Sequence, residues 1–279
     1  MAALRALLHT DHYTEGVVVA PDGVLYFSMT EVSTISRFDP RTGAVEMWAH
    51  VPAANGHAIA PDGTHVVMSS AGAVVILDAS GRTIDVAAVR VDQRWLAYPH
   101  DVVLDTHRGG FYVTDSGYKS TPKDVPADPQ GRVYRADADG GMRQVAGGIA
   151  YSNGVTLSPD GNRLYIGESV TRRIWSYAVG EDGSLGARVL LAETPALSGK
   201  TTVPDGITLG PDGLLYVAHY GAREVLVYDL NGTLTRRLDA GNTTTSHVAF
   251  SADGRTMYIS GGIDSETGPG AIFAVALDG

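Results

Sequence analysis

The sequence predicts a six-bladed β-propeller, an all-β fold in which four-stranded antiparallel sheets surround a central channel. Three observations support this fold: a turn motif that recurs six times, β-rich segments on either side of each copy, and a high content of turn residues. The chain of 279 residues contains 34 glycines and no cysteine, and 44% of its residues are hydrophobic. Many glycines between short apolar runs indicate many tight turns. We expect residues 1–279 to form a single domain.

The recurring motif is an apolar run, then Pro-Asp-Gly, then a second apolar or aromatic run. Proline presets the first turn dihedral, aspartate caps the turn and glycine accepts positive φ, so each copy predicts a hairpin. The segment 102–113 is a degenerate copy, and 252–254 reads Ala-Asp-Gly. Successive copies are 40 to 53 residues apart, which is enough for the four strands of one blade. The turn aspartates and the equivalent residue of the degenerate copy are Asp22, Asp62, His107, Asp160, Asp212 and Asp253.

The last predicted blade lacks an outer strand, because almost no chain follows its apolar run at 271–276. We expect residues 2–8 to supply this strand, which would close the ring and cover two sheet edges. An all-β sandwich is the alternative fold. It explains neither the length of the repeat nor the number of copies.

A polar residue occupies the same position in every copy, seven residues before the turn aspartate or its equivalent. This position begins the innermost strand, so the six side chains are expected to form one ring around the channel. Carboxylate and amide oxygens suit a hard divalent cation such as Ca²⁺, and two converging carboxylates favour a bound cation. The alternative is a polar channel that holds only water. The ring residues are Glu15, Asn55, His100, Asn153, Asp205 and Ser246.

Three of these positions lie in segments that resemble a known family. Thr14-Glu15-Gly16, the run 151–177 and Pro204-Asp205-Gly206-Ile207 resemble elements of the gluconolactonase/regucalcin (senescence marker protein) family of six-bladed propellers. This family is related to diisopropyl fluorophosphatase and the paraoxonases. The resemblance covers nearly the whole chain, and 151–177 is its most specific part.

The resemblance implies a divalent metal ion held by Glu15, Asn153 and Asp205, and hydrolysis of a lactone or a related ester. The third blade departs from the family pattern, because His100-Asp101 stands where the family usually has Asn-Asp. An imidazole is a poorer ligand for Ca²⁺ than for Zn²⁺, Mn²⁺ or Fe²⁺. We therefore predict one divalent cation, Ca²⁺ in the first place, with Zn²⁺, Mn²⁺, Mg²⁺ or Fe²⁺ as alternatives. His100 is either a fourth ligand or a general base.

The predicted reaction is metal-assisted opening of a sugar lactone or another small lactone. Asp205 would activate a water molecule or attack the carbonyl directly, and His100 would relay a proton. Two alternatives use the same scaffold: a non-hydrolytic lyase or cyclase in which His100 is the base, and a propeller that binds a partner without catalysis.

The substrate pocket is expected on the face where the innermost strands begin. Long turn-rich segments at 115–130 and 193–204 reach this face and are candidate lids. The predicted substrate-binding residues are Asn55, Tyr98, Asp101, Tyr118, Tyr151, His219 and His247.

The composition of the chain narrows the classes of molecule that it is expected to bind. The formal net charge is −10, which disfavours contact with nucleic-acid phosphates. No signal peptide and no apolar stretch of membrane-spanning length is evident. We expect a cytoplasmic monomer or weak homo-oligomer that acts on a small molecule and binds neither nucleic acid nor membranes.

Overall fold

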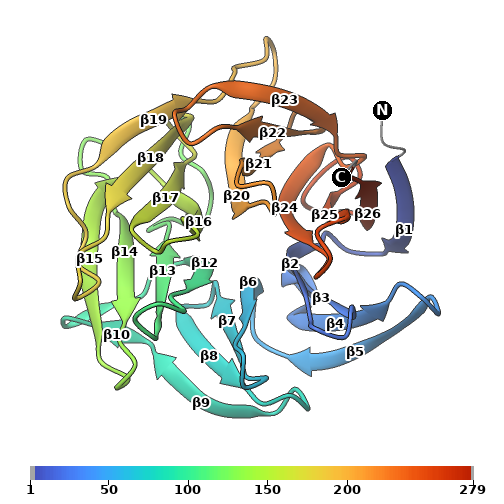
Figure 1. The fold of residues 1–279 in the computed structure, drawn as a ribbon, viewed down its shortest axis with the longest axis horizontal. Coiled ribbons are helices and arrows are strands. Elements are labelled where there is room, and N and C mark those ends of the chain that lie inside the picture. Colours follow the sequence, from blue (N-terminus) through green and yellow to red (C-terminus); the bar gives the residue numbers. More distant parts are fainter. Residues whose placement is uncertain (1–3, 278–279) are drawn as a thin grey trace.

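The fold is the predicted six-bladed propeller. The computed structural model describes residues 4–277, in which six four-stranded antiparallel sheets surround a central channel. Figure 1 shows the blades following one another around the ring in chain order, with the first strand of each blade nearest the channel.

The strands of the first three blades carry these bounds. Blade 1 contains β2 (Glu15–Val19), β3 (Leu25–Met29), β4 (Thr34–Asp39) and β5 (Ala44–His50). Blade 2 contains β6 (Ala54–Ile59), β7 (His65–Ser69), β8 (Ala73–Leu77) and β9 (Thr83–Ala88). Blade 3 contains β12 (Pro99–Leu104), β13 (Phe111–Asp115), β14 (Gly131–Ala136) and β15 (Met142–Ile149). A 3-10 turn, η1 (Thr30–Val32), and a short hairpin, β10 (Arg90–Val91) with β11 (Arg94–Trp95), lie in connections.

The other three blades repeat the pattern. Blade 4 contains β16 (Ser152–Leu157), β17 (Arg163–Glu168), β18 (Arg173–Ala178) and β19 (Val189–Glu193). Blade 5 contains β20 (Val203–Leu209), β21 (Leu215–Tyr220), β22 (Glu224–Tyr228) and β23 (Leu234–Asp239). Blade 6 contains β24 (Thr244–Phe250), β25 (Thr256–Gly262), β26 (Gly270–Ala276) and β1 (Leu4–Thr10).

The N-terminal strand closes the ring. β1 pairs antiparallel with β26, from Leu4 opposite Val275 to Thr10 opposite Gly270. This confirms the prediction for residues 4–8, and the strand continues to Thr10. Residues 2 and 3 of the predicted segment lie outside the described residues.

The Pro-Asp-Gly turns have the backbone dihedrals and side-chain hydrogen bonds expected from their residues. Gly23 adopts a φ of +85°, and Asp22 Oδ1 accepts a hydrogen bond from the Val24 amide at 3.0 Å. The degenerate copy in blade 3 is held differently. Asp105 Oδ1 accepts the amides of His107 and Arg108, each at 3.1 Å, and Asp105 Oδ2 lies 3.0 Å from the buried guanidinium of Arg135. A buried ion pair therefore stabilises the one turn that lacks the repeated motif.

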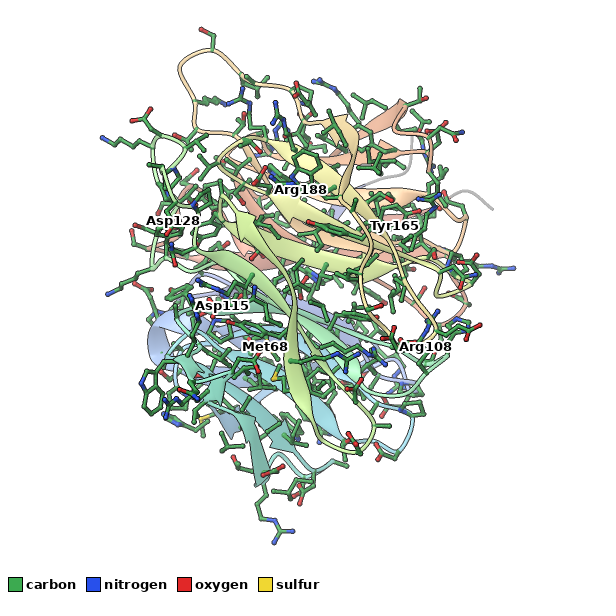
Figure 2. The ribbon with its side chains drawn as sticks, turned by 90° about the vertical axis from the view of Figure 1, so that its left-hand side faces the viewer. Met68, Arg108, Asp115, Asp128, Tyr165 and Arg188 are labelled. Atoms are coloured by element: carbon green, nitrogen blue, oxygen red, sulfur yellow. The ribbon has the colours of Figure 1, made fainter. Side chains whose placement is uncertain are left out.

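The hydrophobic core is divided among the spaces between neighbouring blades. For example, Phe27 of blade 1 packs with Ile272 and Tyr258 of blade 6. Because the apolar side chains are used between blades, the polar starts of the inner strands are left to line the channel. Figure 2 shows the molecule from the side, with Asp115 and Asp128 toward one face and Arg108 toward the other. Within residues 4–277, no helix has the length and apolar character needed to cross a membrane.

Candidate functional site

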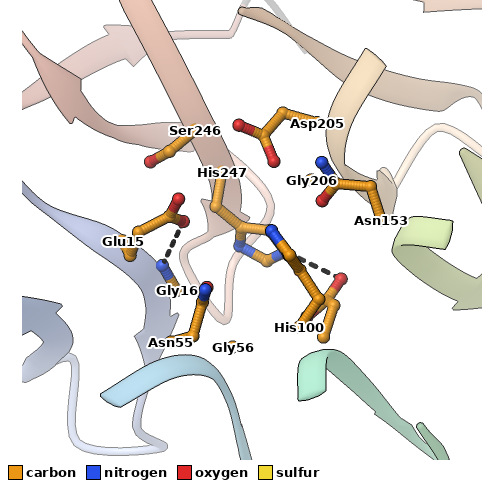
Figure 3. Close-up of a pocket in the computed structure, with 11 residues that line it drawn as sticks. Glu15, Gly16, Asn55, Gly56, His100, Asn153, Asp205, Gly206, Ser246 and His247 are labelled. Atoms are coloured by element: carbon orange, nitrogen blue, oxygen red, sulfur yellow. Dashed lines mark hydrogen bonds and ion pairs between the residues drawn. The ribbon is translucent and has the colours of Figure 1, made fainter. Parts of the chain in front are cut away.

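The six ring residues meet in one small cavity at the mouth of the channel (Figure 3). The cavity has a volume of about 10 Å³ for the centre of a water-sized sphere, which is room for a single water molecule or ion. Its wall comes from all six blades. The lining residues are Glu15, Gly16, Asn55, Gly56, His100, Asp101, Asn153, Asp205, Gly206, Ser246 and His247.

Hydrogen bonds between blades set the diameter of this ring. Ser28 Oγ donates to the carbonyl of Asn55 at 2.8 Å, and Thr114 Oγ1 donates to the carbonyl of Asn153 at 2.6 Å. Ser246 Oγ donates to the carbonyl of Thr14 at 2.9 Å. Each bond joins one blade to the start of the inner strand of the next blade or, at Thr14, to the residue just before it, so the ring positions cannot move apart independently.

Glycines after the ring residues allow the inner strands to approach closely. A Cβ at Gly16 would lie 2.3 Å from the carbonyl oxygen of Asn55, and one at Gly154 would lie 2.3 Å from the amide nitrogen of Ile207. Gly16 also has a φ of +52°. Any larger residue at these two positions would push neighbouring blades apart.

Two carboxyl groups face each other in the cavity. Glu15 and Asp205 are both buried, and Tyr13 Oη donates to Glu15 Oε1 at 2.9 Å. Burial raises the pKa of Glu15 to about 7. Burial, followed by the charge of Glu15, raises the pKa of Asp205 well above its usual value. A bound cation would remove the cost of keeping both groups ionised.

Asn153 points an unpaired oxygen into the same space. Its Nδ2 donates to Ser169 Oγ at 3.1 Å, and Ser169 Oγ donates to the Pro204 carbonyl at 2.8 Å. This chain of bonds orients the amide, and Asn153 Oδ1 is buried without a hydrogen-bond partner. A buried acceptor without a donor is costly, and an absent ligand is one explanation for it.

The donor set therefore fits a hard divalent cation: two carboxylates and one amide oxygen converge in a space of ionic size. The donor set includes the Asn153 amide oxygen of necessity. In the described part of the chain, no group of three or more His, Asp or Glu side chains is arranged to hold a metal ion.

His100 lies beside these oxygens in its neutral form. Burial lowers its pKa to about 4, against the opposing effect of Asp101. Its ring packs edge-to-face on Tyr151, with the ring centroids 5.8 Å apart. A neutral imidazole can accept a proton or bind a metal ion, so both predicted roles remain chemically open.

His247 and Asp101 form a second polar layer one residue beyond the ring. His247 Nε2 lies 3.6 Å from Asp101 Oδ2, and in Figure 3 its side chain crosses the middle of the ring. Asp101 also accepts the amides of Val102 at 2.8 Å and Val155 at 3.0 Å. Burial lowers the pKa of His247, but the charges of Asp101 and Glu15 outweigh it and raise that pKa overall.

The predicted pocket tyrosines lie outside the cavity wall. Tyr98 and Tyr151 each precede a ring residue by two positions, and Tyr151 has a φ of +72°, a strained value for a non-glycine residue. Asp115 holds the connection at Tyr98 by accepting the amides of Ala97 at 2.7 Å and Tyr98 at 2.8 Å. Glu168 accepts the Ala150 amide at 2.6 Å next to Tyr151.

Two other predicted substrate contacts serve local structure. Tyr118 Oη accepts the Gln130 amide at 3.0 Å, which ties together the two ends of the segment 115–130. His219 is fully buried, and its Nδ1 lies 2.9 Å from Glu224 Oε1. Neither residue lines the cavity. The residues brought together there from the predicted set are Asn55, His100, Asp101, Asn153, Asp205, His247 and Glu15.

Sequence reasoning assigned no role to three residues next to the site. Tyr13 has the same two-residue offset from Glu15 that Tyr98 and Tyr151 have from their ring residues, so this rule, applied to every copy, would have found it. Tyr220 and Glu266 are joined by a hydrogen bond from Tyr220 Oη to Glu266 Oε2 at 3.1 Å. No sequence signal marks this pair, because Tyr220 ends β21 of blade 5 and Glu266 lies in the connection between β25 and β26 of blade 6.

Sequence comparison relates the chain to a family that includes lactonases. Residues 13–262 match the model of the SMP-30/gluconolactonase/LRE-like region. The chain is 30% identical over 253 residues to pentonolactonase XacC of Haloferax volcanii, covering 88% of this chain and 80% of the relative. It is 27% identical to a gluconolactonase of Zymomonas mobilis, covering 75% of this chain and 61% of the relative.

Solved structures agree on the fold. A gluconolactonase from Xanthomonas campestris superposes with a TM-score of 0.84 at 23% identity, covering 99% of this chain and 90% of its own. Regucalcin from Agrobacterium tumefaciens, described as a calcium-binding protein, gives 0.81 at 18% identity, covering 98% and 93%. The family match spans most of the chain, and its fold is the one seen here. The chain therefore belongs to the SMP-30/gluconolactonase/LRE-like family.

Proposed function

We propose that this protein is a divalent-metal-dependent lactonase that opens a small lactone to its hydroxy acid. The observation that carries the proposal is the meeting of two buried carboxyl groups, Glu15 and Asp205, with the unpaired buried oxygen of Asn153. The family and its lactonase members support the reaction class.

Glu15, Asn153 and Asp205 would hold the cation, with His100 as a fourth ligand or as a free base. A bound divalent cation supplies polarisation of the substrate carbonyl and stabilises negative charge on its oxygen. Ca²⁺ suits the three oxygen donors, and Zn²⁺, Mn²⁺, Mg²⁺ or Fe²⁺ is favoured only if His100 is a ligand.

The remaining chemistry falls to the side chains of the ring. Asp205 takes a proton from a water molecule, the water oxygen bonds to the carbonyl carbon, and the ring carbon–oxygen bond breaks. The departing ring oxygen receives a proton, so that a carboxylic acid and a hydroxyl group result. Neutral His100 is placed to relay that proton. Direct attack by Asp205 is the alternative route, through an acyl-enzyme that water then hydrolyses.

The test is lactone opening by chelator-treated protein, with each candidate cation added back separately. Acid release from sugar and aliphatic lactones reports turnover. We expect activity only with added metal, and its loss in Asp205→Ala but not in Asp62→Ala, which changes an exposed turn. Full activity of Asp205→Ala or of metal-free protein would refute the proposal. Protein that binds metal but opens no lactone would favour a lyase or cyclase based on His100.

A further inference from the structure

We propose that Asn55 is a fourth oxygen ligand of the cation, which lies between two opposed carboxylate–amide pairs, Glu15 with Asn153 and Asp205 with Asn55. This assignment rests on the metal-dependent function proposed above and deepens it, because it leaves His100 off the ion and available as the base. The sequence predicts Asn55 as a substrate contact. Its hydrogen bonds, its neighbouring glycine and its place in the ring match those of the predicted ligands instead.

Asn55 and Asn153 are oriented by the same chain of hydrogen bonds. Asn55 Nδ2 donates to Ser70 Oγ at 3.0 Å, and Ser70 Oγ donates to the carbonyl of Pro99 at 3.0 Å. The bonds of Asn153 run in the same way through a serine of blade 4 to a proline of blade 5. Because each serine donates its proton to the proline carbonyl, its oxygen can only accept from the amide, which must turn its NH₂ group toward it. In both asparagines Oδ1 is therefore the amide atom left for the cavity, which both residues line.

A glycine follows each of the four oxygen donors of the ring. His100 and Ser246 are followed instead by Asp101 and His247. A Cβ at any of the four glycines would lie 2.3 to 2.6 Å from a backbone atom of the next blade, so these four inner strands approach their neighbours in the same way. Asn55 thus shares its backbone environment with the three predicted ligands. The glycines are Gly16, Gly56, Gly154 and Gly206.

Blades 3 and 6 contribute a floor beneath the ring. They stand opposite each other, and Asp101 and His247 reach across the channel until Oδ2 and Nε2 are 3.6 Å apart (Figure 3). A Cβ at Gly56 would lie 2.7 Å from Asp101 Oδ1, and one at Gly206 would lie 2.1 Å from His247 Cδ2. The glycines after two of the donors therefore make room for this pair. Blades 3 and 6 close the channel below the ring, and the other four blades supply the oxygens.

The four oxygen donors form two pairs across the cavity. The blades follow one another around the ring in chain order, so blade 1 stands opposite blade 4 and blade 2 opposite blade 5 (Figure 1). Glu15 therefore lies across the cavity from Asn153, and Asp205 lies across it from Asn55 (Figure 3). Each pair offers one carboxylate and one amide oxygen, and the two carboxylates together balance a divalent charge. A hard cation prefers this all-oxygen set to an imidazole nitrogen.

The experiment measures the Kd of Ca²⁺ by calorimetry with chelator-treated protein. Asn55→Ala should weaken binding by about tenfold or more, as Asn153→Ala should, because each removes one oxygen ligand. Asn55→Asp keeps an oxygen at the same place and adds a charge, so it should strengthen binding severalfold. Ser70→Ala and Ser169→Ala are a matched pair that should weaken binding about equally, since each releases one amide. His100→Ala should change the Kd by less than about twofold and should lower lactone kcat.

Thermal melts of the metal-free variants show which are folded, and Asn55→Asp decides the question if Asn55→Ala is not. A Kd unchanged in both Asn55 variants, in wild-type protein that binds Ca²⁺, would overturn the inference and leave the lactonase function standing. So would a Zn²⁺ preference that His100→Ala abolishes. Ca²⁺ binding that depends on Asn55, in protein that opens no lactone, would support the ligand and refute the function. Wild-type protein that binds no divalent cation would overturn both.

Discussion

Replacing Asp115 with asparagine is predicted to destabilise the protein and to disturb its site together. Asp115 ends the second strand of blade 3 and is buried. Its Oδ1 accepts the amides of Tyr98 at 2.8 Å and Gly117 at 3.0 Å, and its Oδ2 accepts the amide of Ala97 at 2.7 Å. One carboxylate therefore holds both the connection that carries Tyr98 and the start of the segment 115–130.

The expected loss follows from these three bonds. The substituted asparagine would keep one oxygen, and its NH₂ group would face the Ala97 amide, donor against donor. A hydrogen bond to a charged acceptor contributes about 1.5–3 kcal/mol, and an unpaired buried donor costs about 1–3 kcal/mol. Because the backbone relaxes partly, we expect Asp115→Asn to lower the free energy of unfolding by about 2–4 kcal/mol.

The assay is equilibrium urea unfolding at a fixed metal concentration, followed by circular dichroism. The matched control is Asp62→Asn, since Asp62 also accepts a backbone amide, from Thr64 at 3.0 Å, but at an exposed turn where water replaces the bond. Lactone kcat/KM should fall in Asp115→Asn and stay unchanged in Asp62→Asn, because only the former positions Tyr98. Equal losses of stability in the two variants would refute the reasoning.

Three further predictions follow from the structure. Asp105→Asn should cost about 1.5–3 kcal/mol of unfolding free energy, because it removes the buried one of the two carboxylates that pair with the Arg135 guanidinium, while Asp137 Oδ1 stays at 3.0 Å. Urea unfolding should show a clearly smaller loss for Asp39→Asn, which changes a carboxylate at the surface. His57 and His65 share a buried hydrogen bond of 2.8 Å, and burial lowers both pKa values, that of His65 to about 4. Below pH 6.5 the unfolded chain therefore binds protons at these histidines and the folded chain does not. The free energy of unfolding should fall between pH 6.5 and 4 by about 1.4 kcal/mol per pH unit per histidine. An unchanged pH dependence of stability in a His57→Leu, His65→Leu double variant would contradict this. Ca²⁺ at about 100 times its Kd should stabilise the folded protein by about 2.7 kcal/mol in thermal melts, and an equal shift in Asp205→Ala would contradict the ligand assignment.

The fold could be predicted because the residues that specify each turn and strand lie close together in the sequence. Each Pro-Asp-Gly copy specifies one hairpin through the dihedral preferences of its own residues, and the spacing of the copies specifies the blades. The closing strand could be predicted by counting, since the last blade lacked a partner. The hairpin at β10 and β11 carries no such motif and turns through Asp92 and Gln93, which both have positive φ, so no sequence rule indicated it.

The site could be predicted only where position in the repeat decides the outcome. Glu15, Asn153 and Asp205 meet because equivalent starts of inner strands must converge on the channel axis. Tyr118 and His219 share no repeat position with the ring. Their side chains bond to Gln130 and Glu224, and such partners follow from loop paths that no periodicity describes.

By itself, the sequence determined the number of blades, the closure of the ring and the composition of its inner ring, because turn chemistry and repeat spacing act over a few neighbouring residues. Only the tertiary structure decided which way the Asn153 amide points, that Asp115 holds Tyr98, and that Tyr220 meets Glu266. The first two contacts join residues 16 and 17 positions apart within one blade, and the third joins residues 46 positions apart in neighbouring blades. Their geometry is set by how the blades pack, and packing is a property of the closed ring as a whole.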